Sequence, residues 1–303
     1  MSTVPQALII TVNFRQPDCT LAFLRSVAQL EESSRCHCIV VDNNSGDAST
    51  ARIESEIGQF RNAELLASQE NRGYFGAAKW ALDRHQRAHG LPDWIIVCNN
   101  DIVFDRRDFM TELFAREPQS AGVFAPTVIS QRSGLDSNPM IARRPGPLRI
   151  LRYRFLLSNY HVACLVQKMS PFVRRHRDQL RGLWSRARHG PKQIYAPHGS
   201  IFVFSRSFFE CGGYLDEGSF LFGEELAVAE TCVRIGLPII HEPRLHVVHK
   251  DSQTTGTVLT REMYRYQKRG LQYAISRYLD PRGDEGLSTP ASTRSLVDST
   301  KQL

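Results

Sequence analysis

Residues 94–101 place two amide side chains and one carboxylate directly after an apolar run, in the order Trp-Ile-Ile-Val-Cys-Asn-Asn-Asp. The run shows no polar alternation, which predicts a strand buried on both faces of a parallel sheet. In open α/β sheets, ligands bind just beyond the carboxyl ends of such strands. Asn99 and Asp101 can therefore hold one hard divalent cation whose other ligands come from a bound phosphate. The alternative is an ordinary strand end that turns into a loop, where Asn and Asp are common.

Two further groups of residues could bind a nucleotide and its phosphates. Asp42 ends an apolar run, and a carboxylate there can accept hydrogen bonds from a ribose hydroxyl or a base N–H. Asn71, Arg72 and Gly73 precede an expected helix whose N-terminus favours anions, and a guanidinium strengthens a phosphate site. No GxGxxG sequence follows the first strand, which disfavours a nicotinamide dinucleotide. Taken alone, a glycine such as Gly73 is more typical of a turn.

Glu224 and Glu225 are adjacent carboxylates that follow the apolar stretch 220–223. An apolar wall and mutual repulsion raise a carboxylate pKa, which is the tuning that a general base requires. The alternative is a pair of first-turn acids that only complement a helix dipole. His249 follows another apolar run and could bind a metal or a phosphate, although a histidine in this setting is more often structural.

The elements that position these residues alternate along the chain. Strand patterns at 7–14, 38–42, 65–66 and 94–101 are separated by helical patterns and joined by short links. This alternation predicts an α/β fold with a doubly wound, mostly parallel central sheet flanked by helices. Two short strands are expected at 238–243 and 245–249, and a C-terminal helix after residue 261.

Composition narrows the class of protein. The chain has 303 residues, 42% of them hydrophobic, and an odd number of cysteines, seven. Without a CxxC pair these cysteines predict reduced thiols and no zinc site. No basic, apolar leader opens the sequence, and no apolar stretch reaches the ~20 residues of a membrane span. A cytoplasmic protein is therefore expected.

Residues 139–192 break the alternating pattern and carry most of the positive charge. Between Ile141 and Lys192 thirteen Lys and Arg face one acid, Asp178, so this segment is +12 and the rest of the +7 chain is −5. Apolar residues lie among the arginines, which predicts a basic helical insertion that lies on an anionic membrane surface. The alternative is a solvated insertion. Nucleic acid is not expected as a partner, because no binding motif accompanies the charge.

Taken together, the motifs resemble the family 2 glycosyltransferases with a GT-A-type fold, especially bacterial rhamnosyltransferase-like and polysaccharide-synthesising members. The similar stretches, in the family's order, are 10–14, 40–45, 71–76, 99–101, 213–217, 224–225 and 247–249. Two positions depart from the family pattern. Lys79-Trp80 stands where an Asn is frequent, and Asn99 replaces the first Asp of the family's DxD motif.

The resemblance implies a role for each matching residue. Asn13 and Asp42 would contact the donor nucleotide, and Asn99 and Asp101 would hold Mg²⁺ or Mn²⁺ with His249 close by. Glu225 would be the base, with Glu224 as the next candidate, while His198 and Asp216 would contact the acceptor. The implied division of the chain is 1–138 for nucleotide-sugar binding, 139–192 for the basic insertion, 193–260 for acceptor binding and catalysis, and 261–303 for a C-terminal helix and flexible tail.

The implied activity is inverting, metal-dependent transfer from a UDP- or dTDP-sugar, with dTDP-rhamnose as one candidate, to a glycan or lipid-linked acceptor. It would serve bacterial cell-surface polysaccharide synthesis, such as O-antigen or capsule, at the inner face of the cytoplasmic membrane. One alternative is a sugar-phosphate nucleotidyltransferase, although residues 13–17 lack its Gly-rich basic loop. Another is a non-catalytic basic membrane-binding module. The C-terminal helix could also pair with a second copy to form a homodimer.

Overall fold

The computed structural model describes residues 6–165, 190–251 and 259–279. Its strands are β1 (Ala7–Asn13), β2 (Cys36–Asp42), β3 (Ala63–Ala67), β4 (Trp94–Asn99), β5 (Ile102–Val103), β6 (Val123–Ser130), β7 (Lys192–Ile194), β8 (Ile201–Ser205) and β9 (Ile239–His249). Its α-helices are α1 (Pro17–Ala28), α2 (Ser49–Ile57), α3 (Gly73–His89), α4 (Phe109–Phe114), α5 (Pro147–Leu156), α7 (Arg206–Glu210), α8 (Glu224–Ile235) and α9 (Arg261–Ala274). A π-helical turn, η3 (Ile275–Leu279), continues α9.

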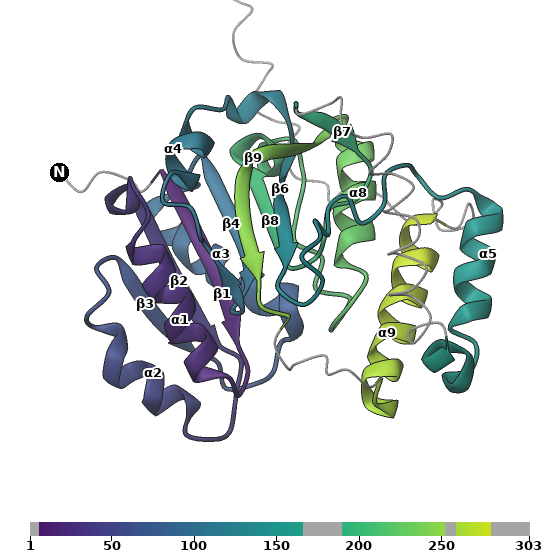
Figure 1. The fold of residues 1–303 in the computed structure, drawn as a ribbon, viewed down its shortest axis with the longest axis horizontal. Helices are drawn as coiled ribbons and strands as arrows, with labels where there is room; N and C mark the ends of the chain where they lie inside the picture. Colours follow the sequence, from purple (N-terminus) through teal and green to yellow (C-terminus); the bar gives the residue numbers. More distant parts are fainter. Residues whose placement is uncertain (1–5, 166–189, 252–258, 280–303) are drawn as a thin grey trace, which may run out of the picture.

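In the described part of the chain the nine strands form one sheet in the order β3-β2-β1-β4-β8-β6-β9-β5, with β7 paired to β9 (Figure 1). The predicted α/β class with a central sheet between helices is confirmed. The pairs from β3 to β4 are parallel, as is β6 with β9. Strand β8 runs antiparallel between β4 and β6, so the sheet is mixed.

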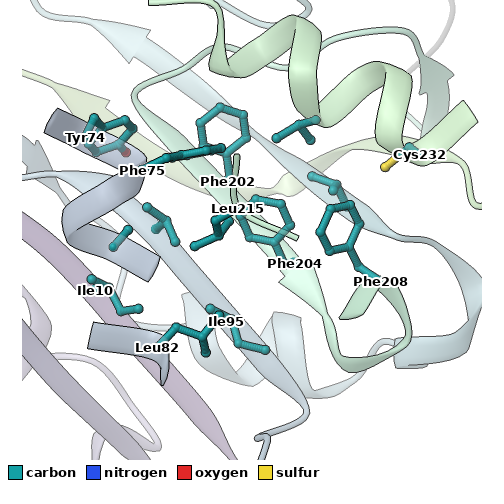
Figure 2. Close-up of a cluster of buried hydrophobic side chains, with 14 of the residues drawn as sticks. Ile10, Tyr74, Phe75, Leu82, Ile95, Phe202, Phe204, Phe208, Leu215 and Cys232 are labelled. Atoms are coloured by element: carbon teal, nitrogen blue, oxygen red, sulfur yellow. The ribbon is translucent and has the colours of Figure 1, made fainter. Parts of the chain in front are cut away.

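The sheet is buried on both faces because successive side chains of a strand point to opposite sides. In β1, Leu8 and Ile10 join the cluster beneath α3 and α8, whereas Ala7 and Ile9 join the cluster beneath α1, α2 and α4. Figure 2 shows the first cluster, with Ile10 and Ile95 from the sheet near Leu82 of α3. The apolar runs of these strands do not alternate with polar residues, because helices cover both faces of the sheet.

Strand β9 corrects the expectation of two short strands. It runs unbroken over eleven residues, and Pro243 lies within it. Its pairing with β6 shifts register between Pro126 and Thr127, which pair with Glu242 and His246. Residues 243–245 of β9 lie between these two pairs and bulge out of the ladder. The missing N–H of Pro243 therefore costs no ladder hydrogen bond.

Helices α5 and α9 stand side by side at one end of the molecule (Figure 1). The chain between α5 and residue 165 contacts α9, because the Tyr264 hydroxyl donates to the Leu157 carbonyl at 2.8 Å and the Tyr160 ring lies 5.5 Å from the Tyr264 ring. The rest of the expected basic insertion, 166–189, and the expected tail, 280–303, lie outside the described residues. No helix in the described ranges has the length and apolar character needed to cross a bilayer.

Candidate functional site

Asn13 and Asp42 lie at the carboxyl ends of the neighbouring strands β1 and β2 and are almost fully buried. The Asn13 amide donates to Asp42 Oδ1 at 2.7 Å, and the Ser45 hydroxyl donates to the same oxygen at 2.6 Å. Asp42 Oδ2 accepts from the Thr50 hydroxyl at 2.8 Å. Both side chains therefore hold the loop after β2, and their contact with a donor nucleotide stays a prediction.

Asn71, Arg72 and Gly73 lie where α3 begins. The Asn71 side chain accepts hydrogen bonds from the Asn43 amide at 2.8 Å and from the Gly73 N–H at 3.1 Å. Arg72 pairs with Glu70 at 2.9 Å, and its guanidinium lies 5.2 Å from the centre of the Trp80 ring. The unexpected tryptophan thus helps to hold Arg72 beside a helix N-terminus, where an anion is favoured.

This loop touches the segment that precedes the paired glutamates. Gly73 has φ +70°, and a side chain there would overlap the carbonyl of Phe220, so only glycine fits. The Tyr74 N–H donates to the same carbonyl at 3.1 Å. A cavity of about 300 Å³ opens between the two segments, lined by Glu70, Asn71, Arg72, Glu217, Gly218 and Phe220. The loop before α3 and the segment 217–220, which precedes the paired glutamates, therefore line one cavity.

Asp101, two residues after the end of β4, meets His249, the last residue of β9. His249 Nε2 lies 3.1 Å from Asp101 Oδ1, and its Nδ1 lies 3.2 Å from Asp251 Oδ1. Burial lowers the pKa of His249, but the hydrogen bond and charge of Asp101, followed by the charge of Asp251, raise this pKa above its usual value. In contrast, Asn99 is half-buried at the end of β4, and its backbone N–H donates to the Ser200 carbonyl at 2.9 Å.

The Asp101 and His249 pair fits a divalent metal. Two adjacent ligands of an octahedral cation, each about 2.1 Å from it, lie about 3.0 Å apart, close to the 3.1 Å between these two atoms. A carboxylate on the far nitrogen of a ligating imidazole is typical of metal sites, and Asp251 occupies that place. No cluster of three or more His, Cys, Asp or Glu side chains arranged for a metal occurs among the described residues. Substrate phosphate and water would therefore supply the remaining ligands.

The turn from His198 to Ser200 lies against both the Asp101–His249 pair and Glu225. The His198 ring lies 5.8 Å from the His249 ring, and its Nδ1 lies 2.8 Å from the Ser200 hydroxyl. Gly199 packs against the Glu225 carboxylate so closely that a side chain at 199 would overlap it. The structure thus brings together Asp101, His249, His198 and Glu225, which are far apart in the sequence.

Glu224 and Glu225 open α8 but differ in their surroundings. Glu224 is buried, and in the part of the chain that the structure describes its Oε1 has no hydrogen-bond partner. Burial, and then the charge of Glu225, raise the pKa of Glu224 to about 8. Burial also raises the pKa of Glu225, although backbone N–H groups, including that of Gly199, oppose this rise. The half-buried Glu225 is the carboxylate that a substrate could reach.

The raised pKa of Glu224 predicts a pH dependence of stability. Between the unfolded pKa near 4.5 and the folded pKa near 8, the native state keeps a proton that the unfolded state releases. The free energy of unfolding should therefore decrease as pH rises through this interval. Urea unfolding at several pH values should show a smaller decrease for Glu224→Gln than for the wild type. Equal decreases in both proteins would contradict the buried, protonated Glu224.

Asp216 connects the C-terminal helix to the segment before α8. Its Oδ1 and Oδ2 each lie 3.0 Å from the Tyr273 hydroxyl, Oδ2 also accepts from the Tyr278 hydroxyl, and Oδ1 accepts from the Gly218 N–H at 2.9 Å. Asp216 is only 8% exposed. Its carboxylate therefore holds α9 and η3 in place, and its predicted contact with an acceptor remains untested.

Gly270 of α9 lies against the backbone of Phe222, where a side chain would overlap the Phe222 carbonyl. Overpacking usually costs about 1–3 kcal/mol, and alanine gains roughly 1 kcal/mol over glycine in a helix. Gly270→Ala should therefore lower the free energy of unfolding by up to about 2 kcal/mol. Because Phe222 precedes Glu224 by two residues, kcat should also fall. Urea unfolding and steady-state kinetics test both effects. Gly58→Ala is the control, because no atom lies within 4 Å of its new methyl group.

Two residues of the site were not singled out from the sequence. Asp251 lies two residues after His249. This spacing in the sequence was the signal that could have identified Asp251. Tyr74 lies within the Asn-Arg-Gly-Tyr-Phe-Gly motif at the edge of the hydrophobic cluster in Figure 2. Its buried hydroxyl has no hydrogen-bond partner among the described residues, and burial raises its pKa well above the usual value. A buried tyrosine in an apolar cluster has no distinct sequence pattern.

Solved structures with similar folds include glycosyltransferases. GalNAc-T7 with UDP, GalNAc and Mn²⁺ has a TM-score of 0.58 and 13% identity over 89% of this chain and 48% of its own. S. aureus TarS 1-349 has a TM-score of 0.51 and 10% identity over 90% of this chain and 73% of its own. The mannosyltransferase PcManGT from Pyrobaculum calidifontis, with GDP-Man and Mn²⁺, has a TM-score of 0.49 and 15% identity over 92% of this chain and 63% of its own.

This chain thus spans less than two thirds of GalNAc-T7 and of PcManGT. Among curated proteins, none matches its sequence. The model of the family described as "Glycosyl transferase family 2" matches residues 8–181, more than half of the chain and the whole stretch from β1 to the basic segment. The protein therefore belongs to glycosyl transferase family 2.

Proposed function

We propose that this protein transfers a sugar from a nucleotide-diphosphate sugar to an acceptor hydroxyl, with inversion at the anomeric carbon. The observation that carries the proposal is the convergence of a metal-binding pair and a carboxylate with raised pKa around one turn. Asp101 and His249 lie on one side of the 198–200 turn, and Glu225 packs on Gly199. Membership of the family supplies the reaction class.

Each residue of the site has one task in the proposed reaction. Glu225 takes the proton from the acceptor hydroxyl, whose oxygen forms a bond to the anomeric carbon while the bond to the diphosphate breaks. Asp101 and His249 would hold Mg²⁺ or Mn²⁺, which supplies positive charge for the departing diphosphate. Arg72, which lines the cavity, and the N-terminus of α3 would bind the same anion. One displacement of this kind inverts the anomeric configuration.

A UDP- or dTDP-sugar is the donor that we favour, with dTDP-rhamnose as one candidate. Support comes from GalNAc-T7, which shares this fold and was crystallised with UDP, GalNAc and Mn²⁺. We place the reaction in bacterial cell-surface polysaccharide synthesis, such as O-antigen or capsule, with a glycan or lipid-linked acceptor. His198, beside both His249 and Gly199, is the residue that we propose for acceptor contact.

Thermal unfolding in the presence of UDP, dTDP and GDP, each with and without Mn²⁺ or Mg²⁺, tests the proposal. A ligand at a hundredfold excess over its Kd stabilises the folded state by about 2.7 kcal/mol. One diphosphate should raise the Tm, and a metal should increase that rise. If none of the three raises the Tm with either metal, the proposed donor site is wrong. Release of pyrophosphate from a nucleoside triphosphate would instead support a nucleotidyltransferase.

A further inference from the structure

Helix α5 presents apolar side chains to solvent. Leu148 is 84% exposed, Leu151 63% and Phe155 67%. With 3.6 residues per turn, the three lie within about 60° of one another around the helix axis. Their opposite neighbours Ile150 and Tyr153 are half-buried, so the helix is seated on the protein through its other side. An exposed apolar stripe on a helix indicates a surface that is covered in the working state of the protein.

Positive charge borders this stripe on both sides. Arg152 lies beside Leu148 around the helix, while Arg149 and Arg154 flank the stripe. Residues 141–165 contain five arginines and no Asp or Glu. Of these five, Arg144 is paired with the buried Glu230 at 2.7 Å. The face thus combines apolar groups with cations, and residues 141–165 contribute no acid to it.

The helix next to α5 adds to this charge and lies close to the catalytic segment. Helix α9 carries Arg261, Arg265, Lys268 and Arg269 against one acid, Glu262. It also contacts Phe222 through Gly270, two residues before Glu224. One helix therefore separates α5 from the carboxylates of the site (Figure 1).

We propose that this face of α5 binds the surface of an anionic lipid bilayer. Leu148, Leu151 and Phe155 would enter the boundary between headgroups and acyl chains, while the flanking arginines reach lipid phosphates with their charged ends. Each basic residue near such a surface adds attraction. The ten-residue helix is too short to span the bilayer, so it lies in the plane of the interface.

Charge distinguishes lipid from the other candidate occupants. Residues 166–189 carry seven Lys and Arg against one Asp, so this segment has the same sign of charge as α5. A second copy of the chain would likewise place one basic face against another basic face. An anionic bilayer instead offers phosphates to the arginines and an apolar layer to the stripe. Bilayer binding does not depend on the proposed reaction, but it would bring the site close to a lipid-linked acceptor.

Co-sedimentation of the full-length protein with vesicles tests this proposal. Vesicles of phosphatidylcholine with 30% phosphatidylglycerol should bind the protein, whereas phosphatidylcholine alone should bind it weakly. Leu148→Ser/Leu151→Ser should weaken binding about tenfold or more, since two apolar side chains leave the interface. Arg149→Glu/Arg152→Glu should have a similar effect. Raising NaCl from 0.1 to 1 M should also weaken binding, because the screening length falls from about 10 to about 3 Å.

Matched variants elsewhere on the surface separate the effect of this face from the effects of nonspecific hydrophobic adsorption and of net charge. Leu135→Ser/Val233→Ser removes two exposed apolar side chains outside α5, and Arg84→Glu/Arg87→Glu reverses two exposed charges on α3. Both controls should bind vesicles like the wild type. The proposal would be overturned if the protein bound neither kind of vesicle. It would also be overturned if the α5 variants bound the anionic vesicles as well as the wild type does. A change in oligomeric state instead of vesicle binding would identify a second copy as the occupant.

Discussion

Glu225→Gln is expected to lower kcat by about 10²- to 10⁴-fold, the usual contribution of a general base. Glutamine keeps the size of the side chain and can still accept the hydrogen bond from the Gly199 N–H, but it cannot take a proton from the acceptor. Steady-state transfer to a soluble acceptor measures the effect. The Tm should change little, because the substitution removes a partly desolvated charge and adds no volume.

Glu224→Gln is the companion variant that separates the two carboxylates. Glu224 is buried and already holds a proton at neutral pH, since its pKa is raised to about 8, so its amide should retain most of the activity. Nucleoside diphosphate binding, measured by the rise in Tm, should survive in both variants. If Glu225→Gln is fully active while Glu224→Gln is inactive, the roles of the two residues are the reverse of those proposed.

Asp101→Ala has the second largest expected effect, a loss of activity of about a hundredfold or more. The substitution removes the carboxylate that lies 3.1 Å from His249 Nε2, and with it a negative charge that would attract a divalent cation. The part of the UDP-induced rise in Tm that depends on Mn²⁺ should disappear, whereas the part seen without metal should remain. Calorimetric titration of Mn²⁺ in the presence of UDP measures the same loss directly.

Asp105→Ala provides a matched control for this variant. Asp105 also pairs with a histidine of β9, because its Oδ1 lies 2.9 Å from His246 Nδ1, but the pair is more exposed than that of Asp101. This control should keep both its activity and its response to Mn²⁺. Full activity of Asp101→Ala, or an equal loss in both variants, would remove Asp101 from the proposed metal site.

The sequence alone determined the strands β1, β2 and β4 and the polar groups at their ends. The run 94–98 is apolar without alternation, and Trp94 to Cys98 are all fully buried in the structure. This pattern is local, because burial on both faces excludes polar residues from every position of a strand. The polar residues Asn13, Asp42 and Asn99 likewise follow apolar runs, so their places at strand ends could be read from the chain. The resemblance in ordered motifs then led to the family.

The tertiary structure decided which distant residues meet. Asp101 contacts His249 because β9 returns to pair with β5 and β6, and Glu225 contacts Gly199 because β8 enters the sheet between β4 and β6. The antiparallel direction of β8 and the bulge around Pro243 depend on partners far along the chain, which no local pattern specifies. For the same reason, the sequence did not show that the Asp216 carboxylate accepts hydrogen bonds from two tyrosines of the C-terminal segment, and its contact with an acceptor stays a prediction.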